Sequence, residues 1–156
     1  MNRVKRDYKS GVIYHVYNRG NRKKRIFRSR IDRLFFISKL KRTVFDCGIE
    51  LIGYCLMDNH FHLVVRQGFG DEISILMQRL LTSYSKYFNL KYRLVGHTFQ
   101  GRYQAKSVFT KSSLRRLIRY IERNPVKEGY VYDPSFYKWL YINPRYIHFT
   151  KTLCQA

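Results

Sequence analysis

The predicted fold centres on the stretch Met57-Asp58-Asn59-His60-Phe61-His62-Leu63-Val64-Val65. Its Asp58-Asn59 pair is typical of a tight turn, and the apolar residues that follow indicate a strand. Because side chains alternate between the two faces of a strand, the alternate apolar residues from Phe61 onward are expected to face a core. His60 and His62 then project together from the opposite face, as a pair able to bind a metal ion. Two ordinary histidines in a half-exposed strand are the alternative.

The composition predicts one domain, spanning residues 1–156, that binds a polyanion. A chain of 156 residues can bury a core without metal or disulfide support. Its 31 Lys and Arg against 10 Asp and Glu give a net charge of +21, which favours nucleic acid over an anionic membrane surface. No run of 18 apolar residues exists, so no membrane span or secretory signal is expected. Cys47, Cys55 and Cys154 are expected to be reduced thiols in a cytoplasm.

Hydrophobic periodicity predicts six elements in the order strand, helix, strand, strand, helix, strand. Their expected ranges are 12–17, 32–45, 49–57, 60–66, 73–88 and 99–108, with Asp32 as the N-cap of the first helix. This order is typical of an α+β, ferredoxin-like split βαβ fold, with an antiparallel sheet and helices on one face. We therefore expect a core over about residues 10–125.

An extra helix after this core carries a second polar group. Ser112-Ser113 are expected to cap it, and Asn124-Pro125 to end it, because proline cannot continue a helix. Tyr120 and Asn124 are four residues apart and therefore lie on one face of this helix. A boundary tyrosine that only packs its ring is the alternative for Tyr120. Beyond the helix, residues 126–150 are rich in aromatic side chains and are expected to wrap back onto the domain.

Together these motifs resemble the single-tyrosine HUH transposases, and most closely their REP-associated branch. The resemblance covers roughly residues 10–145. Besides the His60-Phe61-His62 strand and the Tyr120-x-x-x-Asn124-Pro125 helix, it rests on Tyr14-His15-Val16, Asn18-Arg19-Gly20-Asn21, Met57-Asp58-Asn59-His60 and Phe99-Gln100-Gly101-Arg102-Tyr103. These stretches form four motifs, at residues 14–21, 57–62, 99–103 and 120–125, and four motifs in the same order and spacing are more specific than His-x-His alone.

The resemblance implies a site and an activity. His60, His62 and Asn124 would be metal ligands, and Tyr120 would be the nucleophile that forms a 5′-phosphotyrosine link during DNA transposition. Asn124 departs from the glutamine that insertion-sequence members carry at this position. Two imidazoles and one amide oxygen leave coordination positions open, which suits Mg²⁺ or Mn²⁺ better than structural zinc. Relatives act either as dimers with composite sites or as monomers, and both states remain open.

The expected partner is single-stranded, hairpin-forming DNA, since the scissile phosphate must bend into a cleft. Basic and aromatic side chains are the candidates for phosphate contact and base stacking. They are Arg19, Arg22, Lys23, Arg102, Lys106, Arg115 and Arg119 for phosphates, with Tyr17 and Tyr103 for stacking. The location implied is a bacterial cytoplasm, at the nucleoid when bound to DNA.

Two alternative functions remain at this stage. A non-catalytic ferredoxin-like module could bind single-stranded DNA or RNA on its sheet, but an RNA-recognition motif places aromatic residues where this strand carries histidines. A relic of a transposase that binds DNA but has lost mobility would keep the same pattern.

Overall fold

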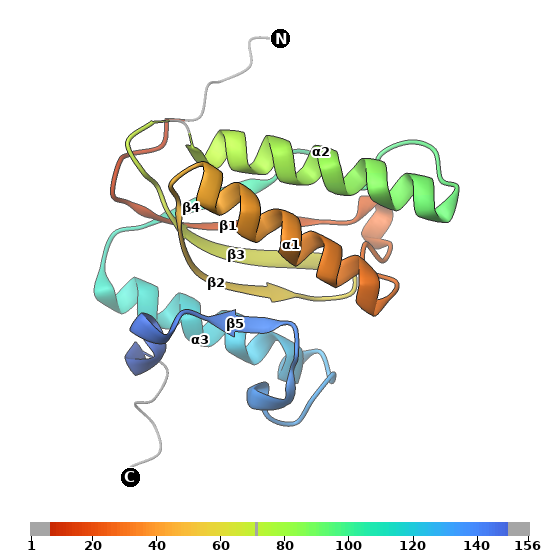
Figure 1. The fold of residues 1–156 in the computed structure, drawn as a ribbon. Coiled ribbons are helices and arrows are strands. Elements are labelled where there is room, and N and C mark those ends of the chain that lie inside the picture. Colours follow the sequence, from red (N-terminus) through yellow and green to blue (C-terminus); the bar gives the residue numbers. More distant parts are fainter. Residues whose placement is uncertain (1–6, 71, 150–156) are drawn as a thin grey trace.

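The computed structural model describes residues 7–70 and 72–149, which form a five-stranded sheet packed with helices (Figure 1). The strands are β1 (Ile13–Arg19), β2 (Glu50–Leu56), β3 (His60–Arg66), β4 (Gln104–Val108) and β5 (Leu140–Ile142). The helices are α1 (Arg30–Asp46), α2 (Glu72–Tyr92) and α3 (Lys111–Lys127), with 3₁₀ turns at Asn21–Lys23, Pro134–Phe136 and Pro144–Phe149. The strand order is β4-β1-β3-β2-β5 and every pairing is antiparallel. The predicted ferredoxin-like α+β fold is confirmed.

Strands β2 and β3 form the predicted hairpin around the turn at residues 58–59. The Met57 N–H donates to the His60 carbonyl oxygen at 2.9 Å, which closes the turn. The Asp58 carboxylate forms ion pairs with Arg33 on α1 and, at 3.4 Å, with Arg25. The turn that starts the histidine strand is therefore tied to the neighbouring helix.

Helices cover both faces of the sheet. Figure 1 shows α1 and α2 side by side on one face and α3 across the other. Phe61 and Leu63 of β3 belong to the larger core beneath α1 and α2, whereas Val64 packs in a second core with Ile118 and Ile121 of α3. The sequence predicted helices on one face and did not place the extra helix. Its apolar stripe accounts for its position against the open face.

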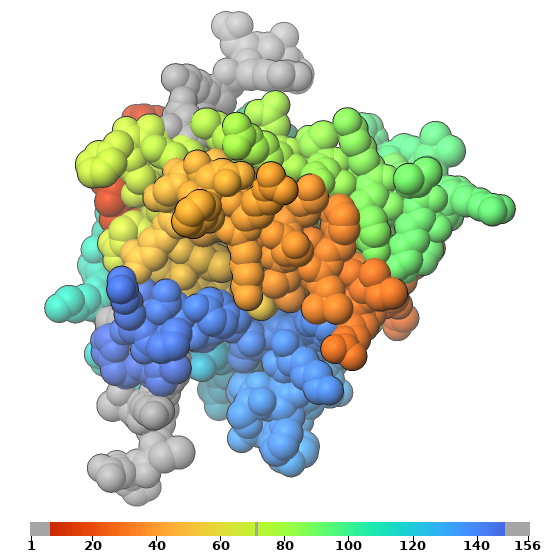
Figure 2. All heavy atoms as spheres, viewed as in Figure 1, coloured from red at the N-terminus to blue at the C-terminus, as the bar shows by residue number. Residues whose placement is uncertain are grey.

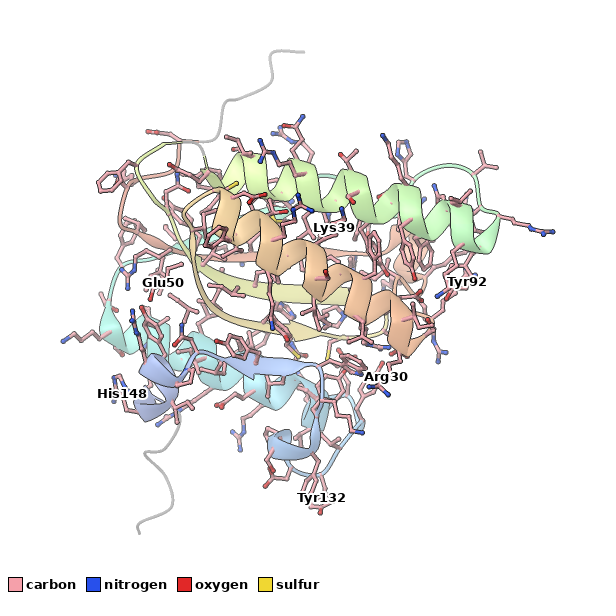
Figure 3. The ribbon with its side chains drawn as sticks, viewed as in Figure 1. Arg30, Lys39, Glu50, Tyr92, Tyr132 and His148 are labelled. Carbon is pink, nitrogen blue, oxygen red and sulfur yellow. The ribbon has the colours of Figure 1, made fainter. Side chains whose placement is uncertain are left out.

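Helix α1 begins at a different residue from the one expected. Ser29 is its N-cap, and Asp32 is the third residue of a capping box in which each side chain accepts from the other's backbone N–H. Asp32 is fully buried and also accepts hydrogen bonds from Tyr92 at 2.7 Å and Lys91 at 2.6 Å. Figure 3 shows Tyr92 at the end of α2 beside the start of α1, where Arg30 is labelled. Asp32 therefore joins the two helices.

We expect Asp32 to make stability depend on pH below 4. Burial alone would raise the pKa of Asp32, but hydrogen bonds from Lys91, Tyr92, the Arg28 backbone and Tyr87 outweigh it and lower the pKa from 3.8 to about 2. A lowered carboxyl pKa stabilises the fold above the unfolded-state pKa, and this stability, roughly 1–2 kcal/mol, is lost as the pH falls through 2. Urea unfolding of Asp32→Asn should show a smaller free energy of unfolding at pH 7 and a flatter profile between pH 2 and 4.

The matched control is Asp46→Asn, because Asp46 is an exposed carboxylate on the same helix with a long 4.0 Å contact to Arg42. Its change in unfolding free energy should stay within about 0.5 kcal/mol. Equal pH profiles for Asp32→Asn and the parent chain would contradict the assignment of this stability to Asp32.

Helix α3 differs from expectation at both ends. Thr110, rather than Ser112-Ser113, is its N-cap and accepts from the Ser113 N–H at 3.0 Å. Pro125 lies inside the helix, which continues to Lys127. This close to the C-terminal end of the helix, proline removes only one backbone hydrogen-bond donor. The Glu128 N–H still donates to the Asn124 carbonyl oxygen at 3.0 Å. The prediction that Pro125 ends the helix is wrong, because the three residues after Asn124 are still helical.

The C-terminal segment adds a fifth strand to the sheet, which was not predicted from the sequence. β5 pairs with β2 at the sheet edge, and the Tyr137 hydroxyl donates to the Leu56 carbonyl at 2.7 Å. Figure 2 shows this blue segment against the orange surface of α1, where Trp139 stacks near Arg33. The last predicted strand is shorter than expected, since β4 begins at Gln104 and Phe99 forms only an isolated bridge with Gly20.

Two further features of the described residues are the character of their helices and the state of their cysteines. None of their helices combines the length and the apolar character needed to cross a membrane. Cys47 and Cys55 are free thiols, and Cys154 lies outside the described residues.

Candidate active site

A cleft of about 750 Å³ opens where the end of β1, the start of β3 and the last turns of α3 meet. Across the two strands, Arg19 is paired with His60 and Tyr17 with His62. The cationic side chains that line the cleft are Arg19, Lys23, Arg102 and Lys127, and its carboxylate is that of Glu128. This cleft combines histidines, a phenol and positive charge in one place.

Strand β3 presents both histidines to the cleft. His60 and His62 are two residues apart, so they share the face opposite Phe61, which is fully buried in the larger core. Their ring centroids are 5.0 Å apart with the planes nearly perpendicular. His62 is only 5% exposed because α3 covers it, whereas His60 lies nearer the rim.

Helix α3 brings Tyr120 and Asn124 of the same chain to these histidines. The Asn124 side chain is buried, and its Nδ2 lies 2.9 Å from His62 Nε2. The Tyr120 ring meets the His62 ring edge-on at 5.5 Å between centroids and is half exposed to the cleft. Asn124 is buried because this face of α3 packs on the sheet. Tyr120 lies one turn earlier on the same face, beside His15 and His62.

Hydrogen bonds orient both histidines in the same way. His62 Nδ1 lies 2.9 Å from Nε2 of His15 on β1, and His60 Nδ1 lies 2.6 Å from Asn59 Oδ1. When each Nδ1 carries the proton, it donates to its partner and leaves the Nε2 lone pair facing the cleft. Such partners are characteristic of metal-binding histidines. His15 thus positions His62, a role that the sequence did not indicate.

The three imidazoles are neutral near pH 7. Burial, together with the nearby charge of Lys106, lowers the pKa of His15 to about 4. Burial, with His15 and His60 nearby, holds the pKa of His62 well below 6.5. Burial also lowers the pKa of His60, against an opposing effect of Glu128. Neutral imidazoles keep a lone pair available for a cation.

The donor set fits a divalent metal ion. Rotating the Asn124 side-chain amide by 180° exchanges its nitrogen and oxygen. Oδ1 would then lie where Nδ2 lies now, 2.9 Å from His62 Nε2. Two ligands about 2.1 Å from one ion and at right angles are about 3.0 Å apart. Among residues 7–70 and 72–149 no three His, Cys, Asp or Glu side chains are arranged to hold a metal by themselves. A site here therefore needs the amide.

Most of the predicted DNA-contacting residues lie at or beside the cleft. Arg19, Lys23 and Arg102 line it directly. Lys106 and Tyr17 line an adjoining depression with His15 and Tyr120, and Arg119 borders another beside Tyr120. These positive side chains surround the tyrosine from β1, β4 and α3.

Three other predicted DNA contacts lie elsewhere. Arg22 faces a separate basic depression near the end of α2. Tyr103 packs against the larger core, and its hydroxyl accepts from the Tyr8 hydroxyl at 3.0 Å. Arg115 is exposed on α3, outside the lining of the cleft.

Glu128 and Lys127 were missed because the helix was expected to end at residue 124. With α3 continued, Tyr120, Asn124 and Glu128 recur every four residues, which is the spacing of one helix face. This spacing in the sequence could have identified Glu128.

Comparison with solved structures confirms the fold. One similar structure is a REP-associated tyrosine transposase bound to a REP hairpin, with a TM-score of 0.71 and 20% identity over 90% of this chain and 82% of that chain. Another, described as a transposase of Deinococcus radiodurans R1, has a TM-score of 0.53 and 15% identity over 79% and 97%. A comparison with curated protein sequences found no match.

A ferredoxin-like sheet whose His-x-His strand faces a tyrosine-bearing helix is the architecture of the single-tyrosine HUH transposases. The sequence model of the IS200-like transposases matches residues 8–124, and this chain belongs to that family. The family predicted from the sequence motifs is confirmed.

Proposed function

We propose that this transposase-family chain nicks and joins single-stranded DNA through a covalent link to Tyr120. The observation that supports it most is the meeting of β3 and α3 within one chain, with Asn124 Nδ2 2.9 Å from His62 Nε2 and the Tyr120 ring beside them. No second copy is needed to assemble these groups. The proposal treats residues 1–156 as one HUH domain, with the last segment as its support.

In this proposal His60, His62 and Asn124 hold one Mg²⁺ or Mn²⁺ ion. Bound there, such an ion would act as a Lewis acid toward a non-bridging oxygen of the scissile phosphate. His15 and Asn59 keep the two imidazoles turned toward the cleft through their Nδ1 atoms. The buried position of Asn124 restricts its amide to the neighbourhood of His62.

Tyr120 is the proposed nucleophile. Its phenol oxygen attacks the phosphorus, a Tyr120 O–P bond forms, and the P–O3′ bond breaks. The phenol proton is lost and the departing 3′-oxygen gains one, so the products are a 5′-phosphotyrosine and a free 3′-hydroxyl. A later 3′-hydroxyl can reverse this exchange and join strands without ATP, because the phosphodiester bond energy is retained.

The proposed substrate is single-stranded DNA that carries a hairpin. The cleft is lined by cations suited to a phosphate backbone, and Tyr17 offers a ring for base stacking. The similar REP-associated transposase was solved with a hairpin, which supports the same substrate class here.

Arg102→Ala should weaken hairpin DNA binding. Loss of one phosphate contact is expected to lower the slope of log affinity against log salt by about 0.7–0.9. Fluorescence anisotropy across a salt series measures this slope. The control is Arg42→Ala, because Arg42 is 78% exposed on α1, across the sheet from the cleft, and its slope should match the parent chain. Equal slopes for both variants would show that Arg102 does not contact a DNA phosphate.

The test of the function uses labelled hairpin DNA with single-stranded flanks, incubated with Mn²⁺ or Mg²⁺ and separated on denaturing gels. We expect a protein–DNA adduct that protease shortens and a chelator prevents. With the label on the 3′ end the adduct should be radioactive, and with the label on the 5′ end only a free fragment should be.

The outcomes distinguish the alternatives. An adduct that carries the 5′-end label would contradict a 5′-phosphotyrosine. Tight binding without any adduct, on every hairpin tested, would favour the non-catalytic binding module.

A further inference from the structure

Glu128 is the C-cap residue of α3, one helical turn after Asn124 and two after Tyr120. Its backbone N–H donates to the Asn124 carbonyl at 3.0 Å, so the turn that carries Glu128 is continuous with Asn124. The side chain lines the same cleft as Tyr120 and His60. The extension of α3 past Pro125 is what brings this carboxylate to the site.

Glu128 and His60 face each other with two acceptors. His60 Nε2 lies 3.8 Å from Glu128 Oε1. Asn59 Nδ2 donates to the Lys23 carbonyl at 3.4 Å, which leaves Asn59 Oδ1 to accept from His60 Nδ1. In the neutral imidazole the lone pair of Nε2 is therefore directed toward the carboxylate. A cation held between them would turn this contact between two acceptors into a favourable one.

The two acceptors are near enough to share an ion after a small movement of Glu128. Ligands about 2.1 Å from one ion are about 3.0 Å apart at right angles and about 4.2 Å apart across it. The 3.8 Å separation lies between these two values, so Glu128 must move toward His60 to share an ion at a right angle. The Glu128 side chain is 41% exposed, so it can rotate toward His62 and Asn124 without displacing buried atoms.

Charge gives a second, independent reason. Two imidazoles and an amide bring no negative charge to a divalent ion, and Arg19, Lys23, Arg102 and Lys127 line the same cleft. These four cations repel such an ion, whereas a carboxylate ligand offsets part of the repulsion. Hard divalent cations also prefer oxygen ligands.

We propose that Glu128, once its exposed side chain has rotated into the cleft, is a fourth protein ligand of the metal ion, added to His60, His62 and Asn124. This inference rests on the proposed metal site. A four-ligand shell leaves fewer coordination positions for DNA and places one negative charge on an otherwise neutral ligand set.

The test is Mn²⁺ binding to the full chain without DNA, measured by calorimetry and by electron paramagnetic resonance. Glu128→Gln keeps the size of the side chain and removes its charge, and it should weaken Mn²⁺ binding by about tenfold or more. The matched control is Glu122→Gln, on the same helix but outside the cleft lining, which should bind as the parent chain does. The measurement is repeated at 0.1 and 0.5 M KCl, since salt screens attraction through solvent more than direct ligation.

The results separate this inference from the proposed function. His62→Ala should abolish Mn²⁺ binding; if it binds like the parent chain, the metal site itself is misplaced. If His62→Ala loses binding and Glu128→Gln does not, only the fourth ligand is wrong. A loss in Glu128→Gln that disappears at 0.5 M KCl would reduce Glu128 to a distant charge and also overturn the proposal.

Discussion

Tyr120→Phe is expected to abolish the covalent protein–DNA adduct and to slow strand cleavage by at least about a thousandfold. Phenylalanine keeps the ring that packs edge-on against His62 and removes only the oxygen that would attack the phosphate. Hairpin DNA affinity and the melting temperature should therefore change little, since Tyr120 is half exposed and no buried polar group loses a partner. Denaturing gels measure the adduct, and anisotropy measures the affinity.

Tyr132→Phe is the control for this experiment. Tyr132 is 83% exposed in the loop after α3, projects away from the body of the protein, and is not among the residues that line the cleft (Figure 3). Its adduct yield should equal that of the parent chain. If the adduct survives in Tyr120→Phe, another residue is the nucleophile, and the proposed role of α3 fails.

His62→Ala should have the second largest effect, a loss of cleavage of at least about 100-fold. His62 is the most buried of the cleft histidines and contacts both His15 and Asn124. Removing it also leaves two polar side chains without their partner, at a cost of about 1–3 kcal/mol for each buried group left unsatisfied. Cleavage is measured at saturating Mn²⁺ and at a temperature below the melting transition of the variant.

Binding and stability must be followed alongside cleavage in this variant. Hairpin affinity should fall less than threefold if His62 serves the metal and not the DNA. His148→Ala is the control, because His148 is an exposed histidine in the last 3₁₀ turn, outside the cleft lining (Figure 3). Equal losses of binding and cleavage in His62→Ala would count against its role as a ligand.

Much of the fold followed from local patterns. β3 has the predicted bounds, His60 to Arg66, because a turn pair before it and period-two alternation within it mark a strand clearly. The split βαβ order followed from the sequence of elements. Asp32 was misassigned as a cap because Ser29 and Asp32 form one capping box, and either residue has the composition of an N-cap.

Only part of the candidate site could be predicted from the sequence. His60, His62, Tyr120 and Asn124 stood out through their spacing and through resemblance to a family, and the structure brings all four together. His15 was noted only as part of the Tyr14-His15-Val16 motif, without a role, and Glu128 was not noted at all. His15 matters only through its pairing with β3, and Glu128 only because α3 passes Pro125.

There is a physical reason why some features could be predicted from the sequence and others could not. Strand alternation, helix periodicity and net charge are properties of neighbouring residues, so sequence alone determined the split βαβ fold, the shared face of the histidines and the excess of positive charge. The contact of α3 with the free face of the sheet joins residues far apart in the sequence, such as Val64 and Ile118, and it depends on packing in the second core. Tertiary structure alone decided that His62 would be buried against Asn124, and that Tyr120 of the same chain would border the cleft.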